Sequence, residues 1–261
     1  MENRKRILLV NDDGLDARGI RILAGHLGKT FDVYACAPDR QRSASSHRVT
    51  YFLNDLHAFP AELAGTRAAY RVDGTPADCT YVGINGLFGD LKFDCVVSGI
   101  NAGWNTASDI AYSGTVAAAM EGLFLGVPAM AVSLDDYDME HGDYGAAAQC
   151  AEKLLDTYLQ DPDCSSYLLN VNVPKGNVEG IEGTVVGGIF DYGRKLETKG
   201  EGGIVTILRP LGPVMEMKDA AVDSDVAAIG RHHVSVTPLN RFGDTAGPAL
   251  KWWREIFKSY Q

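Results

Sequence analysis

The chain has 261 residues, of which 46% are hydrophobic and 22% charged, a balance typical of a folded globular protein and not of a disordered or fibrous one. Its formal net charge of -10 argues against general binding to nucleic-acid polymers or anionic membranes, since such partners are usually met by a basic surface. The first apolar run, Ile7 to Val10, is too short for a signal sequence or a membrane span, so we expect a cytoplasmic protein without a membrane partner.

Short β-rich runs alternate with helical patterns in the first part of the chain, which predicts parallel strands joined by crossover helices. The predicted central strands are Arg6 to Val10, Val33 to Ala37, Cys95 to Ser98, Pro128 to Leu134 and Tyr167 to Val173. Helices are expected over Ile20 to Leu27, from Thr75 onward, from Ser113 onward, and over Ala147 to Tyr158. The five cysteines are odd in number and form no C-x-x-C pair, which predicts reduced thiols.

After Pro174 the sequence changes to glycine-rich, alternating segments that are typical of hairpins. We expect a protruding β element over Ile181 to Val214, a strand at Val234 to Thr237 and a terminal helix over Lys251 to Tyr260. The predicted fold class is therefore α/β, with a Rossmann-like three-layer core of parallel strands over about residues 1–175. A β-hairpin element and a C-terminal extension over about residues 176–261 complete one predicted domain, 1–261.

Oxygen-bearing side chains follow three of the predicted strands, at the sheet edge where open α/β folds bind ligands. Asp12 and Asp13 follow the first strand, Ser43 lies in the loop after the second, and Asn101 follows the third. Carboxylate, hydroxyl and amide oxygens suit magnesium, manganese or calcium, and a divalent cation relieves the repulsion between adjacent carboxylates. A helix cap and a turn acid before Gly14 explain the acidic pair equally well from spacing alone.

A second group of small polar residues, Ser113, Gly114 and Thr115, stands at the predicted start of a helix. Unpaired backbone N–H groups and the helix dipole favour an anion at such a position. An N-cap with a close-packed glycine is the competing explanation. Because Asn101 and Asn105 belong to the same stretch, we expect the anion site to lie beside the candidate metal site.

Five motifs occur in order: N-D-D-G at residues 11–14, A-P-D-R with Arg42-Ser43 at 37–43, G-T-P-A-D-C at 74–79, S-G-I-N-A-G at 98–103 and Y-S-G-T-V-A-A-A-M-E-G at 112–122. Together they resemble the SurE family of survival nucleotidases, and the resemblance touches nearly the whole chain. It implies a divalent-metal-dependent phosphomonoesterase, a 5'-nucleotidase of the acid phosphatase type, which hydrolyses nucleoside 5'- and 3'-monophosphates. It also implies a homodimer or homotetramer in which the C-terminal extension reaches a neighbouring subunit.

The resemblance also implies roles for individual residues. One divalent cation per subunit, Mg²⁺ or Mn²⁺, would be bound by Asp12, Asp13, Ser43 and Asn101. The substrate phosphate would be bound by Asn105, Ser113, Gly114 and Thr115, and Asp12, Asp13 and Asn105 would serve catalysis. The alternative from another class is a non-hydrolytic nucleotide- or metal-binding regulator that uses the same crevice.

The sequence departs from the family pattern at three positions. Ala44 and His47 stand where the family usually has glycine and asparagine, in a loop expected to contact the substrate. Trp104 stands where a proline or another residue is more usual. Stacking on a nucleotide base and packing on the protein core both remain open for this tryptophan.

Overall fold

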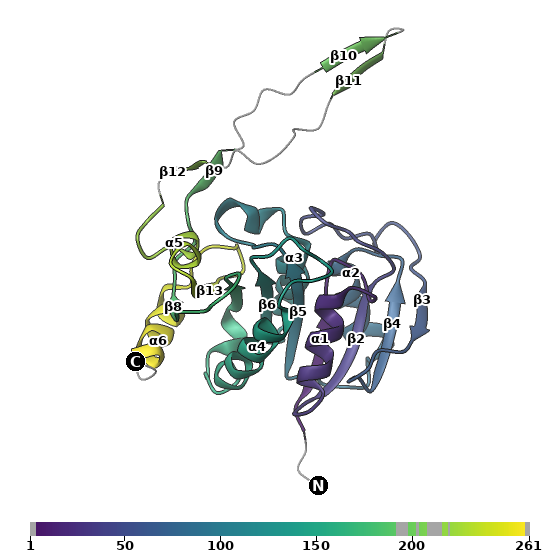
Figure 1. Cartoon of the computed structure of the whole chain (residues 1–261). Coiled ribbons are helices and arrows are strands. Elements are labelled where there is room, and N and C mark those ends of the chain that lie inside the picture. Colours follow the sequence, from purple (N-terminus) through teal and green to yellow (C-terminus); the bar gives the residue numbers. More distant parts are fainter. Residues whose placement is uncertain (1–3, 192–197, 202–203, 208–215, 219, 259–261) are drawn as a thin grey trace.

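The structure is a computed structural model, and it describes residues 4–191, 198–201, 204–207, 216–218 and 220–258. Its central feature is a nine-stranded sheet with the strand order β3-β4-β2-β1-β5-β6-β7-β13-β8 (Figure 1). The strands are β1 (Arg6–Val10), β2 (Asp32–Pro38), β3 (Ala58–Ala61), β4 (Ala68–Val72), β5 (Cys95–Ala102), β6 (Ala129–Leu134), β7 (Leu168–Val173), β8 (Gly180–Gly183) and β13 (His233–Leu239). The predicted α/β class is confirmed, although the sheet is mixed, since β3 pairs with β4 and β13 with β7 in antiparallel fashion.

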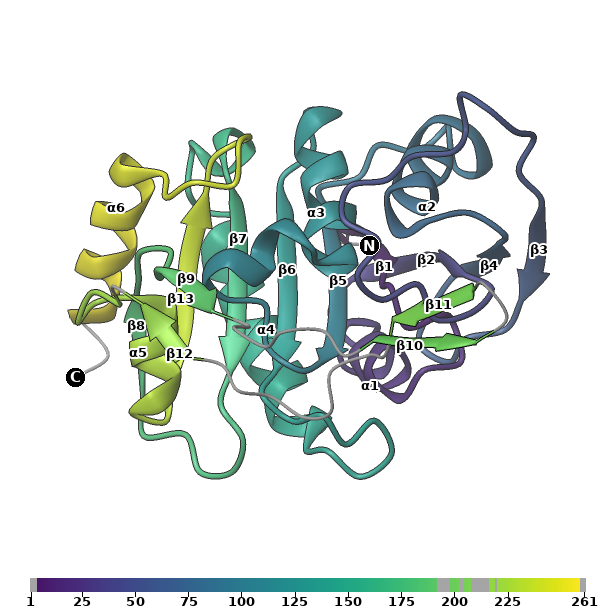
Figure 2. The same ribbon diagram turned by 90° about the horizontal axis from the view of Figure 1, so that it is seen from above.

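Helices cover both faces of the sheet, which makes the three layers visible in Figure 2. The apolar cluster on one face includes side chains of α1 (Arg18–Leu27), α4 (Tyr144–Tyr158) and α6 (Gly247–Lys258). The cluster on the other face includes α2 (Pro76–Val82) and α3 (Gly114–Phe124). Ile7 and Leu9 of β1 point into the first cluster, and Leu8 and Val10 into the second. This alternation explains why a continuous apolar run marks a strand that is buried on both faces.

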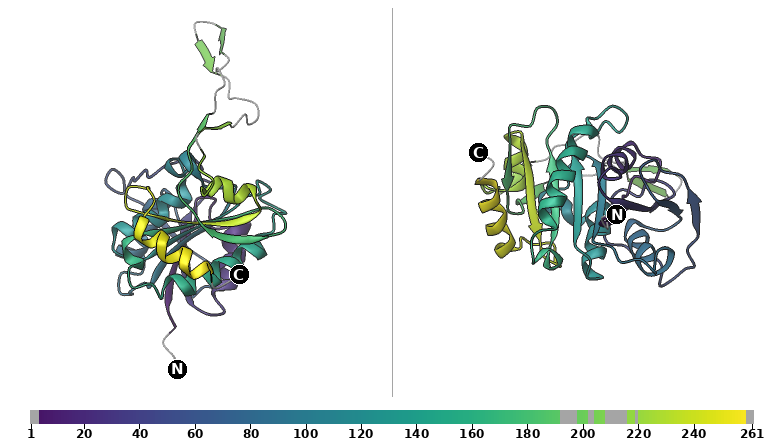
Figure 3. Two further views of the ribbon diagram at one scale, coloured as in Figure 1. Left: turned by 90° about the vertical axis from the view of Figure 1, so that its left-hand side faces the viewer. Right: turned by 90° about the horizontal axis from the view of Figure 1, so that it is seen from below.

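The predicted β element after Pro174 divides between the sheet and an arm. Gly180–Gly183 is the edge strand β8, which pairs with β13, so this part of the predicted protrusion belongs to the core instead. The arm consists of β9 (Ile189–Asp191) paired with β12 (Glu216–Lys218), and β10 (Thr198–Glu201) paired with β11 (Ile204–Ile207). It extends away from the sheet in Figure 1 and in the left view of Figure 3. Residues 192–197, 202–203 and 208–214 of the predicted element lie outside the described residues.

The C-terminal region contributes the short helix α5 (Asp225–Gly230) and the terminal helix α6, which begins at Gly247, four residues before its predicted start. Trp253 is fully buried, and its Nε1 donates a hydrogen bond to the Tyr167 hydroxyl at 3.0 Å. The aromatic stripe of α6 therefore packs against this chain's own sheet. The predicted last residues of the helix, 259 and 260, lie outside the described residues.

The structure also bears on the predictions about the cysteines and about a membrane span. All five cysteines are free, and Cys36, Cys79 and Cys95 are buried. Among the described residues, no helix combines the length and the apolar character needed to cross a membrane.

Two further strands, β3 and β4, were not predicted from the sequence.

Candidate metal and phosphate site

The candidate site lies where β2, β1 and β5 end side by side. These neighbouring strands are parallel, so their carboxyl ends share one edge of the sheet. A hollow of about 500 Å³ opens there, and its lining includes Asp12, Ser43, Asn101, Asn105 and Ser113. The fold thus brings five of the eight predicted site residues to one hollow. Of the other three, Asp13 directly follows Asp12, and Gly114 and Thr115 are the two residues after Ser113.

The acidic loop after β1 is fixed by its own hydrogen bonds. The Asn11 side chain donates to the Gly14 carbonyl at 2.9 Å and accepts from the Gly14 N–H at 3.2 Å. Gly14 has a φ of 95°, in the left-handed region that glycine adopts without strain. The Arg42 N–H donates to the Asp12 carbonyl at 2.7 Å, which fastens the Ser43 loop to the acidic loop.

Asp12 is buried and Asp13 is partly buried, and neither carboxylate forms an ion pair with a basic side chain among the described residues. Burial, and secondly the charge of Asp13, raises the pKa of Asp12 to about 6, although a hydrogen bond from Thr115 opposes this shift. Burial also raises the pKa of Asp13, against opposing hydrogen bonds from Ala102 and Gln41. In the described part of the chain no Lys, Arg or His side chain contributes to either pKa. A divalent cation fits this place, because buried carboxylates are costly unless a positive charge compensates them.

The remaining oxygen donors determine which kind of cation fits. Within the described ranges no group of three or more His, Cys, Asp or Glu side chains could hold a metal ion, so hydroxyl and amide oxygens are needed. The Asn101 Nδ2 donates to the Gly103 carbonyl at 2.9 Å, which leaves the Asn101 side-chain oxygen for a ligand. Ser43 offers a hydroxyl on the same hollow. Such an all-oxygen set suits magnesium or manganese.

Helix α3 begins against Asp12. A Cβ atom added to Gly114 would lie 2.8 Å from the Asp12 Cβ, so only glycine permits this approach. Ser113 caps the helix by accepting the Val116 N–H at 3.0 Å. The Thr115 hydroxyl donates to Asp12 Oδ1 at 2.5 Å, which leaves the Thr115 N–H, and not its side chain, for a phosphate oxygen.

Asn105 is held by polar residues of β6 and β7 that the sequence did not single out as functional. Its Nδ2 donates to the Ser133 hydroxyl at 2.7 Å, and its N–H donates to Asn172 Oδ1 at 2.7 Å. Asn170 and Asn172 both donate to the Asn105 carbonyl, at 2.8 and 3.2 Å. We name these three residues, Ser133, Asn170 and Asn172, the asparagine clamp. The signal for them is N-x-N inside an otherwise apolar strand, since buried polar groups require partners.

Asp225, at the start of α5, holds the chain that follows Asn105. Its buried carboxylate accepts hydrogen bonds from the Ala107 N–H at 2.9 Å and from the Gly187 N–H at 2.8 Å. Ala107 has a φ of 49°, a strained value for a residue with a Cβ. Burial raises the pKa of Asp225 to about 6. A residue of the C-terminal region therefore stabilises the loop of the candidate site.

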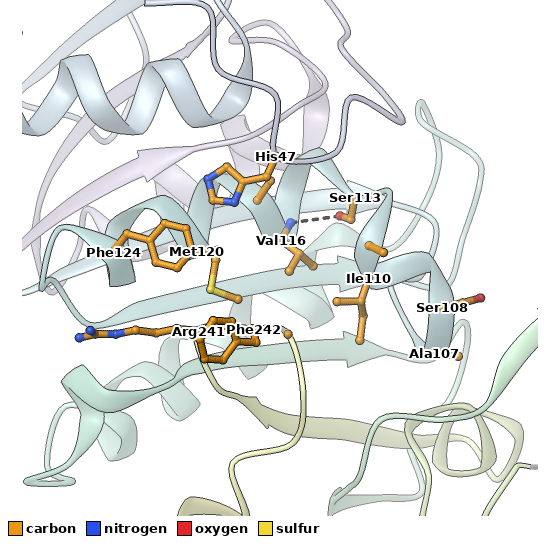
Figure 4. A pocket seen from close by; sticks show the side chains of 13 residues that line it. His47, Ala107, Ser108, Ile110, Ser113, Val116, Met120, Phe124, Arg241 and Phe242 are labelled. Carbon is orange, nitrogen blue, oxygen red and sulfur yellow. Dashed lines mark hydrogen bonds between the residues drawn. The ribbon is translucent and has the colours of Figure 1, made fainter. Parts of the chain in front are cut away.

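The two departures in the Ser43 loop have structural counterparts. Ala44 has a φ of 55°, at the position where the family pattern has a glycine. The His47 Nε2 lies 2.8 Å from Glu121 Oε2, and the His47 ring stacks on Phe124 with the ring centres 5.2 Å apart. This histidine thereby lines a second hollow, of about 290 Å³, which adjoins the first at Ser113. Figure 4 shows that apolar side chains dominate the second hollow, and none of the predicted metal ligands lines it.

Comparisons with known proteins give one consistent result. The family model described as survival protein SurE matches residues 7–191. A protein of Nitrosococcus oceani named 5'-nucleotidase SurE is 42% identical over 240 residues, which are 90% of each chain. A protein of Salmonella paratyphi A named 5'/3'-nucleotidase SurE is 44% identical over 238 residues, again 90% of each chain. The crystal structure of the SurE protein from Aquifex aeolicus is 33% identical and matches 90% of this chain and 93% of its own with a TM-score of 0.75.

Proposed function

Because the chain belongs to the SurE family of survival proteins, we propose that it is a 5'-nucleotidase. It hydrolyses nucleoside 5'-monophosphates, and also 3'-monophosphates, to nucleoside and phosphate. The observation that carries this proposal is the uncompensated pair Asp12 and Asp13 at the start of α3. Negative oxygens for a cation and backbone N–H groups for an anion meet there, as phosphoryl transfer requires.

One divalent cation, Mg²⁺ or Mn²⁺, is assigned to the oxygens of Asp12, Asp13, Ser43 and Asn101. When bound, such a cation polarises a phosphoryl oxygen and lowers the pKa of a water molecule. The burial of Asp12, the partial burial of Asp13 and the all-oxygen surroundings support this assignment.

The chain's own groups supply orientation, charge stabilisation and proton transfer. The Ser113 hydroxyl and the first N–H groups of α3 bind phosphate oxygens, as helix N-termini do. Asn105 uses one side-chain N–H for Ser133 and has a second one for the phosphate. Asp13, which is only partly buried, accepts the proton of the attacking water. Attack in line with the leaving nucleoside oxygen requires no covalent intermediate.

The test is the release of phosphate from a panel of nucleoside monophosphates with Mn²⁺, with Mg²⁺ or with a chelator. Asp13→Asn should lower kcat by about 10²- to 10⁴-fold, because it removes both a metal ligand and a proton acceptor. Asp16→Asn is the matched control, since Asp16 lies nearby in the same loop but its side chain is 81% exposed. Full activity of Asp13→Asn, or turnover that a chelator leaves unchanged, contradicts the proposal. Metal-saturated protein without turnover favours the regulator instead.

We also propose a cytoplasmic homodimer or homotetramer without a nucleic-acid or membrane partner. Ile204, Val205 and Ile207 support the assembly, because these apolar side chains of β11 are 64 to 71% exposed on the arm. Covering them with a neighbouring subunit would remove this exposed surface. Sedimentation of the chain with Ile204→Lys and Ile207→Lys, compared with the native chain, tests the assembly.

A further inference from the structure

A mononucleotide needs a surface for its base as well as for its phosphate. One sugar ring separates the two, so a phosphate at the start of α3 places the base inside or at the rim of the same hollow. Three aromatic side chains line that hollow: Trp104, Tyr112 and Tyr137. Aromatic rings with a free face are the usual platforms for nucleic-acid bases.

The Trp104 ring already packs against another side chain of the protein. Its ring lies nearly parallel to that of Phe190, with the ring centres 5.9 Å apart and the planes 15° apart. Its Nε1 is buried and has no hydrogen-bond partner among the described residues. Packing at the foot of the arm therefore accounts for this tryptophan. Tyr112 is 57% exposed but directly precedes Ser113, which places it at the phosphate end of the hollow.

Tyr137 differs, because one side of its ring is supported and the rest is free. A Cβ atom on Gly103 would lie 2.5 Å from the Tyr137 Cε1, so the ring rests on the backbone between Asn101 and Asn105. The residue is nevertheless 65% exposed. An exposed ring held against the metal loop is positioned for a flat ligand that reaches out of the phosphate site.

The loop that carries Tyr137 is itself fastened. Asp136 accepts hydrogen bonds from Lys175 Nζ at 3.0 Å and from the Asp138 N–H at 3.1 Å. The Gln41 Nε2 lies 3.8 Å from the Met139 sulfur and 3.3 Å from Asp13 Oδ1, so one side chain bridges this loop and the acidic loop.

We propose that Tyr137 is the platform on which the base of the nucleotide stacks, and that it determines the base-dependent part of KM. This inference rests on the proposed nucleotidase function. The hollow of Figure 4 is the competing location for the base. It is smaller, and His47 already covers one face of its Phe124 ring.

The experiment compares adenosine 5'-monophosphate with ribose 5-phosphate, which has the same phosphate and sugar but no base. Tyr137→Ala should raise KM for the nucleotide by about tenfold or more, the usual effect of losing one base–aromatic stack, with kcat nearly unchanged. Kinetics with ribose 5-phosphate should stay within about twofold of the native values. Tyr137→Phe should restore the nucleotide KM, because it keeps the ring. Phe242→Ala, an exposed ring of the Figure 4 hollow, is the matched control and should leave both substrates unaffected.

Three results would overturn the inference. Tyr137→Ala with an unchanged nucleotide KM shows that the base lies elsewhere, and a raised KM in Phe242→Ala places it in the hollow of Figure 4. Equal losses on both substrates in Tyr137→Ala show that the residue supports the metal loop instead. If the native chain releases phosphate from neither substrate, the proposed nucleotidase function is refuted as well. The results for the variants bear only on the place of the base, so the two failures can be told apart. Inhibition by adenosine and by inorganic phosphate gives a second measurement, since only the former should weaken in Tyr137→Ala.

Discussion

The contact between α3 and Asp12 makes Gly114→Ala a sharp test of the site. The added methyl group would lie 2.8 Å from the Asp12 Cβ and 3.0 Å from Asp12 Oδ2, whereas ordinary contacts begin near 3.4 Å. The helix start and the carboxylate must therefore separate by several tenths of an ångström. We expect the free energy of unfolding to fall by about 1–3 kcal/mol, the usual cost of overpacking. Because the displaced groups are a proposed metal ligand and the N–H groups proposed to bind phosphate, kcat/KM should fall by about 100-fold.

Gly25→Ala is the matched control for this prediction. Gly25 also lies in a helix, α1, but a Cβ atom there would meet nothing within 4 Å. Its replacement should raise the free energy of unfolding by about 0.5–1 kcal/mol through helix propensity and leave turnover unchanged. Urea denaturation and steady-state phosphate release measure both quantities. If Gly114→Ala keeps native stability and native kcat/KM, the close approach of α3 to Asp12 does not set the geometry of the site.

Two further predictions concern buried hydrogen bonds. Thr115→Val removes the hydrogen-bond donor to Asp12, so it should raise the pKa of Asp12 further and weaken Mn²⁺ binding. Thr115→Ser keeps a hydroxyl donor and should retain the native Mn²⁺ affinity. Calorimetric titration measures both affinities, and equal values for the two variants would contradict the role of the hydroxyl. The pKa of Asp225 is raised from 3.8 to about 6 in the folded chain, so on raising the pH the unfolded state loses this proton first. The free energy of unfolding should therefore fall by about 3 kcal/mol as the pH rises from about 4 to above 6. Urea midpoints measured across this range should lose that part of the slope in Asp225→Asn, and an unchanged slope would show that Asp225 is not its source.

Local patterns predicted the elements that local chemistry determines. Strand β1 has its predicted bounds, because its apolar run ends at Val10 and the polar residue Asn11 follows directly. Helix α2 begins after Thr75 as the T-P-A-D sequence indicates, since Thr75 and Asp78 form the reciprocal capping box. Helix α3 likewise begins directly after Ser113. Asp12 and Asp13 follow β1 as predicted, whereas Asn101, which was expected to follow a strand ending at Ser98, lies inside β5, because that strand runs to Ala102.

Elements that depend on distant partners were missed. Strand β3 contains Pro60 and lies at the edge of the sheet, where a strand needs little apolar alternation. Edge strand β8 was assigned to the arm, because its glycine-rich sequence does not reveal that β13 lies beside it. The support of Asn105 depends on Asn172, 67 residues further along the chain, and no local pattern contains that distance. The sequence thus indicated which stretches would meet at one hollow, whereas it did not indicate the packing that orders them.

The asparagine clamp makes completion of the site a late event in synthesis. A nascent chain that has left the ribosome only through β6 already carries Asp12, Asp13, Ser43 and Asn101. It still lacks Asn170 and Asn172, which order Asn105 from β7. With the role proposed here for Asn105, hydrolysis would begin only after β7 has been made and inserted into the sheet. A product that is cut or stalled before β7 would keep the acidic pair but lack the side chains that order Asn105.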